Sequence, residues 1–293
     1  MPPLWQTHPV GLVGLGLIGG SLGLDLGRRG VSVRALVHRP ETALRAQQRA
    51  LAAVVSTDPG VLADCGLVIL CLPLDRLLEP EPALLAALPP EAIVSDVGSV
   101  KGPVLAAWEP RLGGRFVGSH PMAGTARSGV EAGEIGLFET RPWVLTPTAG
   151  TDPQAVNEVE ALARALGAVP LRCDAAAHDR AVALISHLPV LVSAALLHAA
   201  DRGAGEALGP LARALASSGF ADTTRVGGGN PDLGLWMARH NRPALLSALT
   251  QYREVLEGLE TLVRAQDWPA LHQQLAEAQA LRPPFLEPPP PPL

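Results

Sequence analysis

The chain is poor in lysine and in aromatic residues. Its 23 basic residues include a single lysine, Lys101, and aromatic residues make up 3% of the sequence. So few aromatic side chains argue against a base-stacking surface for single-stranded nucleic acid. The formal net charge of −5 and the scattering of the arginines argue against an electrostatic surface for a duplex. The sequence therefore predicts no nucleic-acid partner.

Cysteine is also scarce. Cys65, Cys71 and Cys173 are too few and too unevenly spaced for a disulfide framework or a zinc site, so we predict no metal. Small buried thiols in a reducing compartment are the simpler interpretation. Residues 1–9 contain no basic residue, which argues against a secretory signal. Together these features predict a cytoplasmic protein.

One long hydrophobic run is present. Ala181–Ala200 carries no formal charge over twenty residues, about the length that crosses a bilayer. It contains Pro189 and two histidines, and a helix that is apolar all round can also be buried in a protein or in an oligomer interface. Because no second run of this kind accompanies it, we predict a buried helix and no membrane association.

Hydrophobic residues make up 47% of the 293 residues, which predicts a folded chain of one to two domains. In residues 1–172, short apolar runs alternate with helical patterns. The predicted strands are Val10–Val13, Val33–Val37, Ala52–Val55, Leu67–Leu70, Ile93–Asp96, Phe116–Ser119, Trp143–Thr146 and Val169–Arg172. Such alternation is typical of a doubly wound α/β domain of the Rossmann type.

Strand patterns end at Arg172, and residues 173–286 are predicted to form an all-helical domain. Its expected helices are His178–Asp201, Gly205–Ser217, Arg242–Ala265 and Trp268–Leu281. The segment Ser217–Gly234, rich in Gly, Asn, Asp and Pro, is expected to be a loop. Residues 287–293 are rich in proline and are expected to be an extended, disordered tail.

A glycine-rich motif follows the first predicted strand. Its residues are Gly14, Leu15, Gly16, Leu17, Ile18 and Gly19, which fit the pattern G-x-G-x-x-G. Gly14 permits the tight turn, Gly16 lets the main chain approach a pyrophosphate, and Gly19 lets the next helix pack closely. The strand before it and the helix after it make a dinucleotide site the favoured interpretation over a plain glycine turn.

The end of the second strand indicates which dinucleotide is bound. NAD sites usually have an acid there, whereas this chain has His38 and Arg39, and its first acid is Glu41. Arg39 suits a 2′-phosphate, so we predict NADP as the cofactor, with NAD possible. Alternatively, Arg39 is a solvated charge before the next helix. Further cofactor contacts are predicted at the carboxyl ends of the fourth and fifth strands. These residues are Cys71, Leu72, Pro73 and Asp96.

Several polar segments resemble one known family. In chain order they are GLGLIGGS, DVGSVK, GSHPMAG, HDRAVALISHLP and GFADTTR, and they span nearly the whole chain. Together they resemble the prephenate/arogenate dehydrogenases of tyrosine biosynthesis. The resemblance implies a homodimer formed by the helical domain and a small-molecule substrate. It also implies NAD(P)-dependent oxidative decarboxylation of prephenate to 4-hydroxyphenylpyruvate, or alternatively of arogenate to tyrosine.

The resemblance also implies roles for individual residues. His120 would accept the hydroxyl proton of the substrate, which a neutral imidazole with a pKa near ~6.5 can do. Ser99 would lie near the same hydroxyl. Arg225 would bind a substrate carboxylate, since a guanidinium binds that group with two hydrogen bonds. His187 and Lys101 would contact the substrate or lie close to it.

Structural alternatives remain open for these residues. Ser99 could cap a helix that begins near Val100, and Arg225 could pair with an aspartate of its own loop. His187 could be packed in the core. His178 and Asp179 are expected to cap the long helix rather than react.

Two other functions are alternatives to a prephenate/arogenate dehydrogenase. β-Hydroxyacid dehydrogenases usually rely on a lysine in the helical domain, and this chain has none there; imine reductases share the architecture. A non-catalytic nucleotide sensor would not require Ser99, His120 and Arg225. One departure from the family is Val190, where many relatives have a histidine after the SHLP segment.

Overall fold

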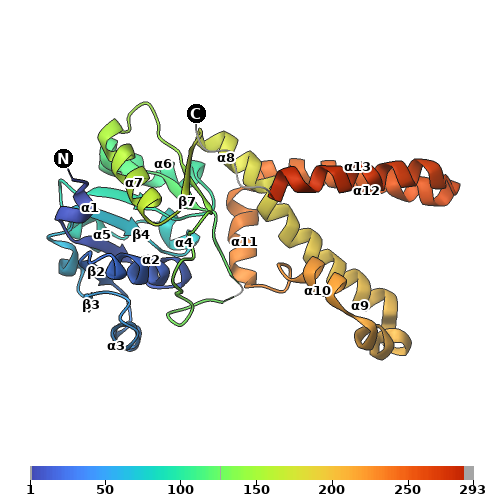
Figure 1. Ribbon diagram of the computed structural model, residues 1–293, viewed down its shortest axis with the longest axis horizontal. Coiled ribbons are helices and arrows are strands. Elements are labelled where there is room, and N and C mark those ends of the chain that lie inside the picture. Colours follow the sequence, from blue (N-terminus) through green and yellow to red (C-terminus); the bar gives the residue numbers. More distant parts are fainter. Residues whose placement is uncertain (1, 126, 287–293) are drawn as a thin grey trace.

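The computed structural model describes residues 2–125 and 127–286. An α/β domain leads through helix α8 (Ala175–Val182) into an elongated set of helices (Figure 1). The last strand ends at Arg172, two residues before the cap of α8. The doubly wound sheet followed by helices confirms the predicted fold class. The predicted proline-rich tail, residues 287–293, lies outside the described residues.

Six parallel strands form the main sheet, in the order β3-β2-β1-β4-β5-β6. They are β1 (Val10–Val13), β2 (Val33–Leu36), β3 (Val54–Ser56), β4 (Leu67–Leu70), β5 (Ile93–Asp96) and β6 (Phe116–Val117). Val13 at the carboxyl end of β1 lies beside Leu36 on one side and Leu70 on the other. The strand order reverses at β1, and open α/β sheets bind ligands at the carboxyl ends of strands at that point.

Helices cover both faces of this sheet. They are α1 (Leu4–Thr7), α2 (Leu17–Arg28), α3 (Pro40–Gln48), η1 (Pro59–Leu62), α4 (Leu74–Leu78), α5 (Pro82–Ala87), α6 (Gly102–Leu112), η2 (Gly113–Arg115) and α7 (Pro153–Ala165). Neighbouring residues of β1 enter different apolar clusters: Leu12 belongs to the cluster that includes Leu22 of α2, and Val13 belongs to the cluster that includes Trp108 of α6. Burial on both faces explains the near-continuous apolar runs of the strands.

A second sheet begins where the predicted strand Phe116–Ser119 divides. It has the order β7 (Ser119–Pro121), β8 (Pro142–Leu145) and β9 (Val169–Arg172), and β7 runs antiparallel to β8. Gly118 lies between β6 and β7, where a Cβ atom would come within 2.7 Å of the Thr146 hydroxyl. The chain therefore passes from one sheet to the other at a residue without a side chain, and β7 carries His120.

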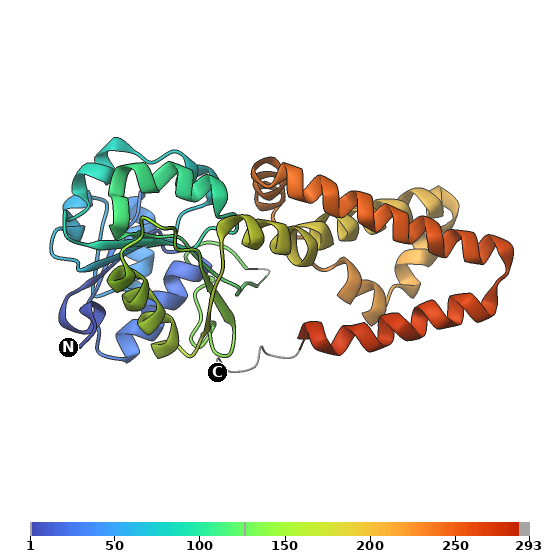
Figure 2. The same cartoon turned by 90° about the horizontal axis from the view of Figure 1, so that it is seen from above.

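The remaining chain is helical. After α8 come a π-helical turn η3 (Ala183–His187), α9 (Leu188–Leu215), α10 (Ser218–Thr224), α11 (Pro231–His240), α12 (Arg242–Ala265) and α13 (Trp268–Leu286). Figure 2 shows α13 running back toward the α/β domain from the far end of α12, with the two helices diverging from their connection. The predicted loop Ser217–Gly234 is wrong in part, because it contains α10 and the start of α11. Its polar residues act at helix ends: Asn230 caps α11, and Thr224 bonds to the Phe220 carbonyl.

Most residues of Ala181–Ala200 are not buried within the single chain, which leaves an oligomer interface as the place for the predicted burial of this helix. This run belongs to a helical stretch, Ala175–Leu215, that is long and apolar enough to cross a membrane, and only 22% of its most apolar part is buried. Its exposed apolar side chains are Leu184, Ile185, Leu196, Leu208, Leu211 and Leu215. A surface this apolar typically marks a contact with another molecule.

Candidate active site

The glycine-rich turn lies between β1 and α2 and has the shape that a dinucleotide requires. Gly14 has a φ of +96°, and a Cβ there would lie 2.5 Å from the Cys71 carbonyl oxygen. At Gly19 a Cβ would lie 2.1 Å from the Gly14 oxygen, so the helix packs directly on the turn. A Cβ at Gly16, the N-cap of α2, would meet no atom within 4 Å. The helix N-terminus thus faces open space that a pyrophosphate fits.

The segment after β4 forms the neighbouring wall of this turn. Cys71 donates its main-chain N–H to the Val13 oxygen at 2.8 Å, and Leu72 and Pro73 lead into α4. Leu15 is buried, whereas Leu17 and Ile18 are partly exposed in the first turn of α2. Burial raises the pKa of the Cys71 thiol. Cys71 is therefore a neutral thiol and not a nucleophile at pH 7.

His38 and Arg39 lie at the carboxyl end of β2, beside β1. Both side chains are exposed, and Nε of Arg39 donates to Nε2 of His38 at 2.8 Å. Arg39 occupies the N-cap position of α3 but makes no side-chain capping bond. Its guanidinium forms no ion pair within residues 2–125 and 127–286. Two basic side chains are thus held side by side where a dinucleotide ribose would lie.

His120 meets a histidine from the helical part of the chain. Its Nδ1 lies 3.0 Å from Nε2 of His178, and Nδ1 of His178 lies 2.8 Å from Oδ1 of Asp179. Both imidazoles are buried, with exposures of 8% and 3%. The prediction that His178 and Asp179 cap the long helix is wrong, because Asp174 caps α8 by accepting from the Ala177 N–H at 2.7 Å.

Asp179 instead caps helix α6 of the α/β domain. Its carboxylate accepts from the Lys101 N–H at 2.7 Å and from the Gly102 N–H at 2.9 Å. Ser99, for which capping was the structural alternative, lies two residues before the N-cap and makes no capping bond in the described chain. Asp179 therefore joins α8 to the loop that carries Ser99.

His187 lies on the π-helical turn, a feature that is frequent at functional sites. Its Nδ1 lies 3.2 Å from Nδ2 of Asn241, which also donates to the Asp179 carbonyl at 2.7 Å. Nε2 is buried and makes no hydrogen bond of normal geometry within the described residues, although the main chain of Ser99 approaches it. Burial lowers the pKa of His187 to about 4. The sequence did not single out Asn241, since an Asn before Arg-Pro is also an ordinary helix start.

The environment of His120 keeps its imidazole neutral. Burial lowers the pKa of His120 well below 6.5, and the positive charge of Lys101 lowers it further. Nε2 of His120 makes no hydrogen bond within the described residues, since Nδ1 is the atom that contacts His178. The ring therefore presents an unprotonated nitrogen at pH 7, as a general base requires.

Asp96 and Lys101 form a buried ion pair beneath this site. The Lys101 ammonium donates to the Asp96 carboxylate and, at 2.6 Å, to the Ser119 carbonyl. The same carboxylate accepts from the main-chain N–H groups of Ser119 at 3.0 Å and Gly98 at 2.7 Å. Both side chains are fully buried. In this arrangement neither the predicted substrate contact of Lys101 nor a cofactor contact of the Asp96 carboxylate is available.

Arg225 lies on the opposite side of the site, at the end of α10. It is exposed and lines a cavity of about 380 Å³ together with Met122, Gly124 and Thr125, which follow His120 in the chain. Glu134 and Arg141 also line it. Arg225 forms no ion pair with Asp222 or Asp232, the alternative considered above. The structure thus brings Arg225 to the loop that follows the strand of His120.

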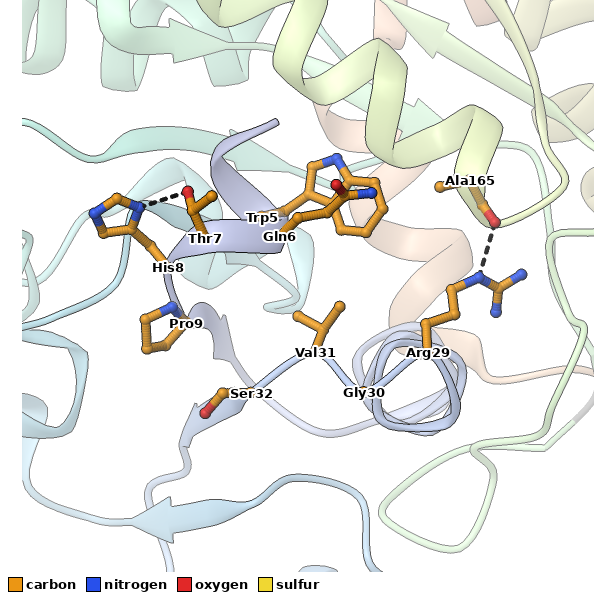
Figure 3. A pocket seen from close by; sticks show the side chains of 10 residues that line it. All are labelled: Trp5, Gln6, Thr7, His8, Pro9, Arg29, Gly30, Val31, Ser32 and Ala165. Carbon is orange, nitrogen blue, oxygen red and sulfur yellow. Dashed lines mark hydrogen bonds between the residues drawn. The ribbon is translucent and has the colours of Figure 1, made fainter. Parts of the chain in front are cut away.

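A second cavity, of about 620 Å³, lies away from all predicted site residues (Figure 3). Its lining includes Pro9 and Ser32, the residues before β1 and β2, so it opens at the amino ends of these strands. Arg29 on its edge already donates to the Ala165 carbonyl at 2.9 Å. This cavity is at the wrong end of the sheet for a ligand of the glycine-rich turn.

Comparison with protein families gives two matches along the chain. Residues 22–171 match the family described as "Prephenate dehydrogenase, nucleotide-binding domain". Residues 174–277 match "Prephenate dehydrogenase, dimerization domain".

Individual relatives agree. The cyclohexadienyl dehydrogenase of Zymomonas mobilis is 31% identical, and the match covers 93% of this chain and 94% of the relative. The crystal structure of Synechocystis arogenate dehydrogenase has 43% identity and a TM-score of 0.77, covering 95% of this chain and 100% of that one. The structure of prephenate dehydrogenase from A. aeolicus with hydroxyphenyl propionate and NAD+ has 28% identity and a TM-score of 0.87, covering 94% and 97%.

Proposed function

Because the chain belongs to the prephenate dehydrogenase family, and is therefore a dehydrogenase that uses a nicotinamide cofactor, we propose that it converts prephenate to 4-hydroxyphenylpyruvate with NADP+. The observation that carries the proposal is a neutral, buried His120 on β7, the strand that leads directly into the loop lining the cavity of Arg225. The test is formation of 4-hydroxyphenylpyruvate and reduced cofactor in equal amounts by the purified protein.

His120 acts as the general base. A bound nicotinamide would supply the acceptor for the hydride on the ring carbon that bears the hydroxyl. The hydroxyl proton must leave as the carbonyl forms, and Nε2 of His120 is the free nitrogen that accepts it. Loss of the carboxylate as carbon dioxide then leaves its electron pair in the ring, which becomes aromatic, and the phenolate oxygen takes back a proton to give the phenol. Ser99, on the loop held by Asp179, is assigned to the same hydroxyl.

Arg225 and His187 bind the substrate. The guanidinium of Arg225 forms no ion pair with any residue of 2–125 or 127–286, and it can bind a carboxylate with two parallel hydrogen bonds. The Asn241 amide donates to Nδ1 of His187, so a neutral His187 carries its proton on Nε2. This buried N–H is a hydrogen-bond donor for a carboxylate or carbonyl oxygen of the substrate.

Arogenate is the second candidate substrate. It is favoured by one observation, the 43% identity to the Synechocystis arogenate dehydrogenase. Arogenate has an amine on its side chain where prephenate has a ketone. This group is far from the ring carbon whose hydroxyl proton His120 would accept. Tyrosine as the main product, at a higher kcat/KM than prephenate oxidation, would support this candidate over the first.

We assign the cofactor preference to Arg39, with His38 beside it. The 2′-phosphate of NADP would lie near the carboxyl end of β2, where these two exposed basic side chains are hydrogen-bonded to each other. No acid that would bind a free ribose hydroxyl precedes Glu41 in this turn.

Replacing Arg39 by alanine should remove the preference for NADP. Hydrogen bonds to charged groups contribute about 1.5–3 kcal/mol, so kcat/KM for NADP+ should fall about 10- to 100-fold while that for NAD+ changes little. Arg111→Ala, an exposed arginine on α6, is the matched control. An unchanged ratio of kcat/KM for the two cofactors in Arg39→Ala would reject this assignment.

The helical domain forms a homodimer in this proposal. Its exposed apolar side chains include Leu196, Leu208, Leu211, Leu215, Leu246, Tyr252, Val255, Leu256, Val263, Trp268, Leu275 and Leu281. No residue of α13 is buried within the single chain. A surface of this kind, in a segment that matches a dimerization domain, is best covered by a second copy.

Light scattering coupled to size exclusion should therefore give a mass of about twice the 30.5 kDa of one chain. Leu211→Glu would place a charge in the apolar surface and should shift the mass toward the monomer, whereas the exposed Arg28→Glu of the α/β domain should not. A monomer for the wild-type chain at micromolar concentration would contradict the proposal.

A further inference from the structure

Two side chains of the described site, His178 and Asp179, have no role in the mechanism given above. They form a continuous hydrogen-bonded chain with the base, from Asp179 to His178 to His120. We propose that His178 and Asp179 are positioning residues that hold His120 as the Nδ1–H tautomer, so that Nε2 is the proton acceptor. The catalytic consequence of this inference rests on the proposed function, whereas the tautomer of His120 does not depend on it.

Asp179 sets the direction of the chain. Its carboxylate accepts from two main-chain N–H groups of Lys101 and Gly102, and a carboxylate that accepts several such bonds stays ionised. Burial works to raise the pKa of Asp179, but the hydrogen bonds from His178, Lys101 and Gly102 outweigh it, and the pKa is lowered. Asp179 is therefore an acceptor only, and Nδ1 of His178 must be the donor.

The bond to Asp179 fixes the tautomer of His178, and the tautomer of His178 in turn fixes that of His120. A neutral imidazole has one N–H and one free lone pair. In the neutral form of His178, donation by Nδ1 to Asp179 leaves the lone pair on Nε2, which accepts from His120 at 3.0 Å. His120 must donate with Nδ1, which leaves its Nε2 unprotonated. A His120 with its proton on Nε2 would instead place two lone pairs against each other.

The neighbouring His187 is held in the opposite tautomer. The Asn241 amide group donates both to the Asp179 carbonyl and to Nδ1 of His187, so its orientation is determined and His187 carries its proton on Nε2. The site thus holds two neutral imidazoles of different function, one that accepts at Nε2 and one that donates there. Residue types alone do not distinguish them.

Asp179 also compensates the charge that forms during the reaction. Proton transfer makes His120 cationic in a buried position beside Lys101, which opposes a second positive charge. The His120 imidazolium donates more strongly to His178, whose other nitrogen is bound to the Asp179 carboxylate. A negative charge two hydrogen bonds away therefore stabilises the imidazolium, as in other carboxylate–histidine pairs that act as bases.

The tautomers can be measured without cofactor or substrate. Two-bond ¹H–¹⁵N spectra of the ¹⁵N-labelled protein at pH 7.5 distinguish a protonated from an unprotonated ring nitrogen, and His120→Asn and His178→Phe assign the signals. We expect Nδ1–H for His120 and His178 and Nε2–H for His187. Nε2–H for His120 in the wild-type protein would overturn the proposal, whether or not any variant folds.

Variants of His178 test the consequence for catalysis. His178→Phe removes the acceptor, so His120 should lose its single tautomer and kcat should fall at least about tenfold, as expected for a base in the wrong tautomer. KM should stay within about twofold, because the lost interaction acts in the transition state. His178→Gln places an amide oxygen near the former Nε2 position and should restore the tautomer and part of kcat.

The control and the outcomes separate this inference from the proposed function. Arg180→Gln, an exposed neighbour on α8, should change neither the tautomer nor kcat. A His178→Phe protein with unchanged kcat and tautomer would overturn the positioning role. If the wild-type protein shows the expected tautomers but oxidises neither prephenate nor arogenate, the proposed function fails and the positioning of His120 stands.

Discussion

Replacing His120 by asparagine should lower kcat by about 10²–10⁴-fold, the usual contribution of a general base. Asparagine can still donate to His178 but has no lone pair of comparable basicity at the position of Nε2. The substrate hydroxyl proton would then leave to water, and the transition state would lose its acceptor. KM should change far less than kcat, because Arg225 and His187 are untouched. Steady-state kinetics with saturating NADP+ measures both values.

The loss must be shown to be chemical rather than structural. His120 is buried on β7, but asparagine can keep the hydrogen bond to His178, so the variant should unfold at nearly the wild-type temperature. His272→Asn on α13, an exposed histidine, is the matched control and should keep full activity. A kcat of His120→Asn within about threefold of wild type would remove His120 from the role of base.

Replacing Lys101 by methionine should destabilise the protein by about 3–5 kcal/mol, the usual cost of leaving one member of a buried ion pair unpaired. Burial lowers the pKa of Lys101, while the charge and hydrogen bond of Asp96 work to raise it. Without the ammonium, the Asp96 carboxylate keeps only its two main-chain donors. Urea unfolding followed by circular dichroism measures the change in the free energy of unfolding.

Two further variants test this interpretation. In Lys101→Met combined with Asp96→Asn, no buried charge is left unpaired, so part of the lost stability should return. Lys101→Arg keeps the charge but brings a larger, planar group to a fully buried site, so it should also be destabilising. A Lys101→Met protein as stable as wild type would show that the ion pair contributes little to the fold.

The sequence predicts the main sheet well because its signals are local. Three of its predicted strands, Val10–Val13, Leu67–Leu70 and Ile93–Asp96, have the observed bounds, since apolar runs between turns report burial on both faces. The division of Phe116–Ser119 into β6 and β7 could not be seen, because it depends on which sheet each half pairs with. Likewise, the polar residues of Ser217–Gly234 indicate helix ends as well as loops.

The individual site residues could be named from motifs, but their connections could not. His120 and His178 are 58 residues apart in the chain, and their contact arises only because α8 packs against α6. The roles of Lys101 and Asp96 were misjudged for a related reason: spacing placed them near the site but could not show that they bind each other. Arg39, Ser99, His187 and Arg225 keep their predicted roles as proposals.

The measurement that tests the central claim most directly is absorbance at 340 nm with the purified protein, NADP+ and either prephenate or arogenate, followed by identification of the product. The account predicts NADPH and 4-hydroxyphenylpyruvate from prephenate in equal amounts, at a higher kcat/KM than tyrosine formation from arogenate. No reduced cofactor from either substrate, with NADP+ or with NAD+, would contradict it.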